Sequence, residues 1–233
     1  MELNTKFLIE TFILCLKAIP ITLKITIVTL IISVPIGFLF GFAAYRKVPV
    51  LDQLFKVIVS FLRGIPFILV IFLIYSVFPS ALNSFLKSIG SDFNIYDLDN
   101  IIYAYIIFSI TQSAQLAAVF KSALETVPDS QLEAALAIGM TPAQGYRRII
   151  LPQALSAATP VLASSVTDLI KSTSLAFSLS VMDITATAKI AAAGQMAYVE
   201  AYLDIFLIYV LLIVIVERLF KIAEKRLKVY KTA

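Results

Sequence analysis

The chain has 233 residues, of which 60% are hydrophobic, and its formal net charge at pH 7 is +4. Histidine, the commonest general base near neutral pH, is absent, and a single cysteine excludes an intrachain disulfide and a cysteine-based metal site. The seven glycines form no G-x-x-x-x-G-K-S/T sequence, which excludes a P-loop for nucleotide binding. We therefore predict no catalytic residue and no metal site, and the composition favours a membrane protein.

The N-terminal segment is amphipathic. In residues 1–20, apolar side chains recur at helical spacing among Glu10, Thr11 and Lys17, and Pro20 is expected to end the helix. Such a helix suits the outer membrane–water interface. The uncharged run 25–45 follows, and it is long enough to cross a hydrocarbon core of ~30 Å.

Four further runs are long and apolar enough to cross a membrane, and they cover about residues 57–78, 101–120, 154–180 and 202–219. Backbone groups in lipid must form their hydrogen bonds within the segment, so these spans are expected to be helices. We therefore predict an all-α membrane protein with one transmembrane domain, residues 1–233, and five transmembrane helices.

Lysine and arginine gather in the turn after the first span, in the loop that follows the third span and in the tail from Arg218. The loop 79–100 has Lys87 against three aspartates. By the positive-inside rule, the basic segments lie in the cytoplasm, so the N-terminus is expected outside and the C-terminus inside. The same rule accounts for the net positive charge without a nucleic-acid partner.

The loop at about residues 121–152 contains sequence signals for short helices. Ser130 and Glu133 fit a capping box, and Gly139 is placed to end that helix in a left-handed conformation. A second capping box begins at Thr141, and Pro152 is expected to hinder continuation of the second helix. We predict two short helices joined by a tight turn. A passive solvated connection explains the polarity, whereas a docking surface for another protein also explains the structured helix starts.

The residues of this loop resemble the EAA signature of the membrane subunits of bacterial ABC importers. The matching positions are Glu133, Ala134, Ala135, Gly139, Ile149, Leu151 and Pro152. The resemblance implies the type I importer permease fold, with the first short helix acting as a coupling helix in a groove of a separate ATPase. ATP and magnesium would then be bound by that ATPase, and this chain would need no cofactor.

Other stretches resemble the polar amino-acid branch of these permeases, whose members carry histidine, glutamate, glutamine, arginine or cystine. The matching stretches are residues 61–66, 127–133, 169–175 and 200–202. Three positions depart from the pattern, because Ser130 replaces a usual glycine, Ala118 a common acid and Lys121 a frequent arginine. The resemblance implies a bacterial cytoplasmic membrane protein that works with a second permease, identical or paralogous, with cytoplasmic ATPases and with an extracytoplasmic substrate-binding protein.

Two charges lie inside the fourth predicted span. Asp168 and Lys171 are three residues apart, so they share a helix face with Ser164 and can pair. Charges at membrane depth are costly and usually face a cavity or a partner. The two residues either form an internal ion pair that lets the helix pack, or they line a translocation pathway. The alternative function for the whole protein is an autonomous secondary transporter or channel that uses Asp168 and Lys171.

Three more polar residues are candidates for the pathway. Ser109 and Gln112 lie in the third span, where they either face the pathway or bridge helices. Arg63 lies near the cytoplasmic end of the second span, where it either anchors the helix or contributes to an inner gate.

Overall fold

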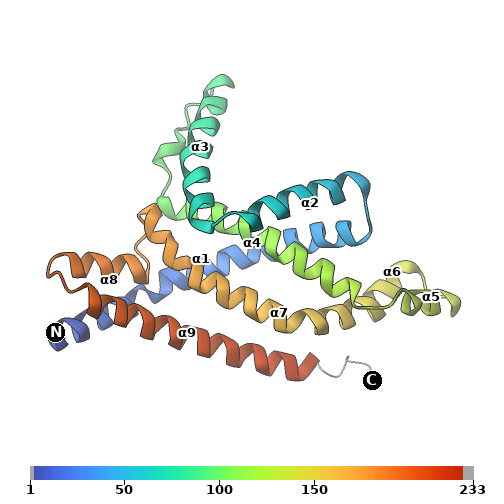
Figure 1. Ribbon diagram of the computed structural model, residues 1–233. Helices are drawn as coiled ribbons and strands as arrows, with labels where there is room; N and C mark the ends of the chain where they lie inside the picture. Colours follow the sequence, from blue (N-terminus) through green and yellow to red (C-terminus); the bar gives the residue numbers. More distant parts are fainter. Residues whose placement is uncertain (1–2, 228–233) are drawn as a thin grey trace.

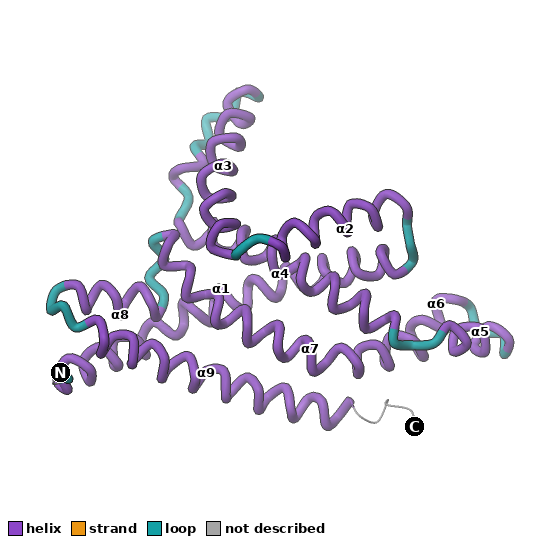
Figure 2. Tube along the Cα trace, viewed as in Figure 1, coloured by secondary structure: helices purple, strands orange, loops and turns teal. Residues whose placement is uncertain are grey.

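The computed structural model describes residues 3–227, and every regular element in that range is helical (Figures 1 and 2). The α-helices are α1 (Thr5–Tyr45), α2 (Pro49–Gly64), α3 (Phe67–Ser88), α4 (Asn100–Glu125), α5 (Asp129–Ala137), α6 (Pro142–Gly145), α7 (Leu151–Ser172), α8 (Ile184–Ala193) and α9 (Tyr198–Leu227). Five helical segments in the described range are long and apolar enough to cross a membrane, which confirms the predicted all-α fold with five spans. The basic residues Lys228 and Lys231 of the tail lie outside the described residues.

The first helix is continuous across Pro20, so the prediction that Pro20 ends a separate N-terminal helix was wrong. α1 has 41 residues, which corresponds to about 60 Å at ~1.5 Å per residue. Its buried face continues on both sides of the proline, with Cys15 and Ala18 before it and Thr22 and Ile25 after it. Packing of this face against the other helices holds the helix together where proline removes a backbone donor.

The second predicted span, 57–78, is divided by a break in the chain. α2 ends at Gly64, and α3 begins at Phe67 in a different direction, away from the other long helices (Figure 1). Pro66 disfavours the helical conformation at the preceding residue, and Ile65 is accordingly extended, with φ −109° and ψ 138°. The prediction therefore joined the end of one helix to the start of the next.

The other three predicted spans coincide with α4, with α7 and its extension, and with α9. α7 passes at its C-terminal end into a 3-10 helix, Thr173–Leu179. The chain then turns into α8, whose first turn is capped by Asp183: its carboxylate accepts a hydrogen bond from the Ala186 amide at 2.8 Å. Asp183 also accepts a hydrogen bond from the hydroxyl of Tyr209, at 3.3 Å, which ties α8 to α9.

α1 packs along α4 through small side chains. Most residues on its buried face are alanine, glycine, serine or threonine. Gly37 and Gly41 form a G-x-x-x-G pair. A Cβ atom at Gly37 would lie 2.8 Å from the Leu116 Cβ, and one at Gly41 would lie 2.5 Å from the Ala117 carbonyl oxygen. Membrane helices gain no hydrophobic driving force from one another, so this close approach supplies the packing that holds the pair together.

We expect Gly41→Ala to destabilise the protein because the added methyl group meets backbone and the two helices must separate. Overpacking of this kind costs about 1–3 kcal/mol, which lowers Tm by roughly 2–12 °C for a chain of this size. Thermal unfolding in detergent measures the effect. Gly64→Ala is the matched control because nothing lies within 4 Å of a Cβ atom there; equal Tm values for the two variants would contradict the packing account.

Candidate functional site

The loop that follows α4 folds into two helices, as predicted, but the first of them begins earlier than expected. α5 begins at Asp129, directly after the extended Pro128, and no side chain caps its start. Ser130 is thus already inside the helix, and the predicted capping box of Ser130 and Glu133 was wrong. Asp129 instead places a negative charge in the first turn, where it interacts favourably with the helix dipole.

The turn between α5 and α6 has the predicted form. Gly139 is left-handed, with φ +86°. The amides of Gly139 and Met140 donate to the carbonyls of Leu136 and Ala135, at 3.0 and 3.1 Å, which is the hydrogen-bond pattern of a Schellman motif. The capping box at the start of α6 is confirmed: the Thr141 amide donates to the Gln144 side chain at 2.9 Å, and the Gln144 amide donates to the Thr141 hydroxyl at 3.3 Å.

The residues of the EAA signature divide into an exposed set and a packed set. Glu133, Ala134 and Gly139 are exposed on α5 and its turn. Ala135 is buried and faces Gly145 of α6, where a Cβ atom would lie 2.7 Å from the Leu132 side chain. The remaining signature residues, Ile149, Leu151 and Pro152, are half-buried. The first set is therefore available to a partner, while Ala135 holds the two helices against each other.

Pro152 does not end the second helix, contrary to the prediction. The chain runs from α6 through a π-helical segment, Tyr146–Ile150, directly into α7. The amide of Leu151 donates to the carbonyl of Tyr146, five residues earlier. Because Pro152 lies in the first turn of α7, its missing amide falls where the helix passes from π to α geometry, and the chain accommodates the ring there.

A polar groove of about 680 Å³ lies between α4, α7 and the break between α2 and α3. Its polar lining residues are Arg63, Thr111, Gln115, Ser122, Thr126, Ser164, Ser165 and Asp168. Among the lining residues in the described part of the chain, Asp168 is the acid and Arg63 the base. Ala118, the position at which the family often has an acid, also lines the groove. The groove thus joins three of the predicted pathway residues, Arg63, Ser164 and Asp168.

Asp168 and Lys171 form the ion pair that their spacing predicts. The Lys171 Nζ lies 2.9 Å from a carboxylate oxygen of Asp168. Both side chains are exposed within this single chain, Asp168 at 64% and Lys171 at 55%. The pair therefore lies on an open surface of α7, and burial in the interior of this chain is not the reason for the pairing.

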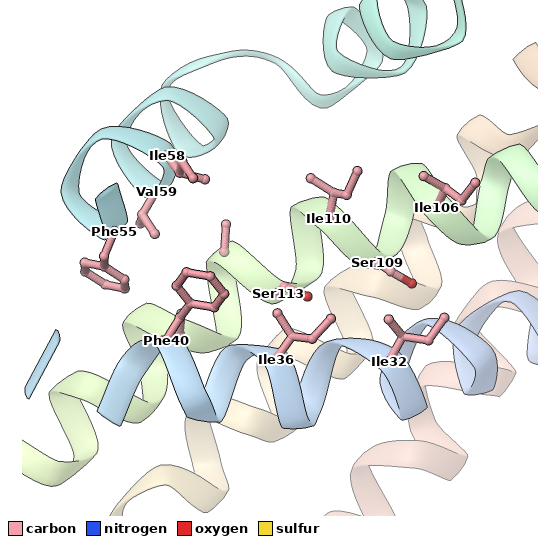
Figure 3. A pocket seen from close by; sticks show the side chains of 12 residues that line it. Ile32, Ile36, Phe40, Phe55, Ile58, Val59, Ile106, Ser109, Ile110 and Ser113 are labelled. Atoms are coloured by element: carbon pink, nitrogen blue, oxygen red, sulfur yellow. The ribbon is translucent and has the colours of Figure 1, made fainter. Parts of the chain in front are cut away.

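Ser109 and Gln112 lie on other faces of α4. Ser109 points into a separate, apolar pocket of about 350 Å³ between α1, α2 and α4, beside Ile32, Ile36 and Ile110 (Figure 3). Gln112 is buried and does not line the polar groove. The structure thus does not bring these two residues to Asp168.

The α4 residues that do line the groove, Thr111, Gln115 and Ser122, were missed. They recur with Ala118 and Thr126 at intervals of three, four and seven residues, so they form one helical stripe that the sequence contains. Polarity alone does not separate these residues from Ser109 and Gln112, whereas their position on the stripe does. Within residues 3–227, no three histidine, cysteine or acidic side chains are grouped so that they could hold a metal ion.

The sequence matches a known protein family over most of its length. The model of the family described as binding-protein-dependent transport system inner membrane component matches residues 33–229. The probable amino-acid permease protein YxeN of Bacillus subtilis (strain 168) is 37% identical, and the match covers 99% of this chain and 99% of YxeN. The L-cystine transport system permease protein TcyL of the same organism is 32% identical over 92% of this chain and 87% of TcyL.

Solved structures share the fold. A chain from a crystal structure of an amino acid ABC transporter with histidines is 22% identical, with a TM-score of 0.79, and the match covers 97% of this chain and 100% of that chain. A chain of the MetNI methionine ABC transporter in an inward-facing conformation is 19% identical, with a TM-score of 0.71, over 92% of this chain and 96% of that chain. The resemblance to membrane subunits of bacterial ABC importers is confirmed, and the chain belongs to the family of binding-protein-dependent transport system inner membrane components.

Proposed function

We propose that this multi-pass protein of the bacterial cytoplasmic membrane is the permease subunit of an ABC importer for a polar amino acid or a related compound. A separate ATPase would bind and hydrolyse ATP and would drive transport through the loop at residues 121–152. The observation that carries the proposal is the form of that loop, which is a structured helix pair with its signature residues Glu133, Ala134 and Gly139 exposed.

The surface of α5 suits protein docking. Ile138 is 76% exposed and Leu136 is 41% exposed, next to the small exposed side chain of Ala134. Apolar side chains surrounded by polar residues are typical of interaction sites. The Schellman turn fixes the end of the helix, so a partner would meet a preformed surface and would not have to order a flexible loop. These features support α5 as the coupling helix that binds the ATPase.

The arrangement of the basic segments supports an N-terminus outside the cell and a C-terminus in the cytoplasm. The turn between α1 and α2, the α5–α6 pair and the end of α9 lie at the same end of the molecule, whereas the N-terminus and α8 lie at the opposite end (Figure 1). The first end carries Arg46, Lys47, Arg147, Arg148 and Lys221. These residues outnumber Lys6 and Lys189, which lie at the end of the N-terminus and α8, so the distribution fits the positive-inside rule with the first end in the cytoplasm.

The polar groove suits a zwitterionic substrate. Arg63 can attract a carboxylate, and Asp168 can attract an ammonium group, while hydroxyl and amide side chains between them can form hydrogen bonds. Lys171, paired with Asp168, would have to release the carboxylate for a substrate or share it. The relatives with amino-acid and L-cystine names support this class of substrate.

A second permease and a substrate-binding protein complete the proposed importer. α3 projects from the rest of the chain (Figure 1), and its apolar residues Leu69, Phe72, Leu73 and Val77 are exposed. The polar groove is also open to the outside of this single chain on the side where Asp168 is exposed. A second permease, identical or paralogous, would close that side, lipid would cover the remaining apolar surface, and an extracytoplasmic binding protein would deliver substrate at the end that carries α8.

We expect Ile138→Asp to prevent binding of the ATPase because it places a charge in the apolar centre of the docking surface. Ile89→Asp is the matched control. Ile89 is 63% exposed, ends α3 as Ile138 ends α5, and also precedes a left-handed glycine. Affinity purification of the tagged permease from cells that express the whole transporter measures the amount of ATPase retained. Retention by both variants, or loss from both, would contradict the proposed docking surface.

We expect Asp168→Asn to reduce substrate uptake while the ATPase remains bound, because the neutral amide loses the charge-assisted interaction. A hydrogen bond to a charged group contributes about 1.5–3 kcal/mol, so the expected loss of uptake is roughly tenfold to a hundredfold. The control is Asp52→Asn, which removes an acid that pairs with Lys56 at 2.6 Å on α2, outside the groove. Uptake of labelled amino acids in whole cells measures the effect, and wild-type uptake by Asp168→Asn would remove Asp168 from the pathway.

A further inference from the structure

Tyr146 joins two parts of the molecule that are 100 residues apart in sequence. The Arg46 Nη1 atom, in the turn after α1, donates a hydrogen bond to the Tyr146 hydroxyl at 2.8 Å. The Arg46 guanidinium carbon also lies 5.5 Å from the centroid of the Tyr146 ring, and the Phe42 ring meets that ring edge to face at 5.4 Å. One side chain thus receives a polar contact and an aromatic contact from the end of α1.

Tyr146 is also the first residue of the π-helical segment that connects the α5–α6 pair to α7. Its ring packs at the edge of a cluster whose buried members are Leu124, Val127, Ile150 and Ala154. The π segment is a single turn with i→i+5 geometry, and such turns are frequently found where a helix has a functional irregularity. Displacement of α5 and α6 would therefore reach Tyr146 before it reaches α7.

Beside the Arg46–Tyr146 contact, the end of α1 and α5 are separated by a polar groove of about 640 Å³. Arg46 and Lys47 line it on one side, and Asp129 and Glu133 line it on the other. The groove leaves room between α5 and the turn after α1 in which α5 could move. Tyr146 also lines this groove, and its hydroxyl accepts the hydrogen bond from Arg46.

We propose that Arg46 and Tyr146 are positioning residues that transmit movement of the α5–α6 pair to α1, and through α1 to the wall of the substrate groove. α1 is in backbone contact with α4 at Gly37 and Gly41, and α4 supplies Thr111 and Gln115 to the groove. α7, which supplies Asp168, is connected to Tyr146 through the π segment. Both walls of the substrate groove are therefore connected to Tyr146: α4 through Arg46 and α1, and α7 through the π segment. The inference rests on the proposed docking of the ATPase on α5.

The test uses variants that remove the contact and leave the docking surface unchanged. Tyr146→Phe retains the ring and loses the hydroxyl acceptor, and Arg46→Gln removes the guanidinium. Lys47→Gln is the control because it removes a charge from the same turn and from the lining of the same groove. The complete transporter is reconstituted in liposomes with its ATPase and binding protein. The measured quantities are the amount of ATPase bound, the ATP hydrolysed without substrate and the substrate taken up per ATP hydrolysed.

We expect both single variants to bind the ATPase and to hydrolyse ATP without substrate at the wild-type rate, and to take up about tenfold less substrate per ATP. The double variant should lose less than the product of the two single losses, because both single variants remove the Arg46–Tyr146 hydrogen bond. Wild-type uptake per ATP in the single variants, or loss of ATPase binding, would overturn the transmission role. If the wild type itself binds no ATPase, the proposed function fails, and this result is distinct from the other two.

Discussion

The close contact between α1 and α4 is the constraint on which the rest of the structure depends. Two glycines, Gly37 and Gly41, allow the α1 backbone to lie against α4, at distances that exclude even a methyl group at Gly41. α4 then presents its polar stripe, including Gln115, to the groove that α7 completes. In lipid, where apolar burial between helices gains little, this fit of small residues takes over the role that large side chains have in a soluble core.

In the proposed function, the loop at residues 121–152 combines two tasks within one short signature. Its exposed residues would face the ATPase, and its packed residues keep the shape of the surface. Ala135 is a clear example of the second kind, because it is buried against the short second helix although it follows the exposed Glu133 and Ala134. A preformed surface reduces the ordering cost of docking, and a rigid helix pair passes on a displacement that a flexible loop would absorb.

Local chemistry in the sequence predicted some features well. The left-handed Gly139 and the capping box of Thr141 and Gln144 depend on neighbouring residues only, and both have the predicted geometry. The five spans follow from the length and composition of the apolar runs. The ion pair of Asp168 and Lys171 follows from helical spacing. Apart from the spans, whose number reflects the composition of longer runs, these features depend on interactions within a few residues of the chain.

Some of the features that were predicted wrongly depend on residues that are distant in sequence, whereas others depend on local geometry that the predictions misread. Pro20 has the local properties of a helix end, yet packing on both sides of it keeps α1 continuous. The same residue type does break the chain at Pro66, where α3 departs from the bundle. Pro152 is accommodated by a π turn. The position of Ser109 also required the structure, because polarity alone does not say which face of α4 meets the groove.

The most direct test of the central claim, that α5 is where the ATPase docks, is crosslinking from a single introduced cysteine. The natural Cys15 is buried, so a cysteine at position 138 would react selectively. We predict that Ile138→Cys, labelled in native membranes with a reagent that joins a thiol-reactive maleimide to a photoreactive benzophenone, forms a covalent adduct with the ATPase subunit on illumination, and that Ile89→Cys forms none. Absence of the adduct from Ile138→Cys, or an equal yield from both positions, would contradict the account.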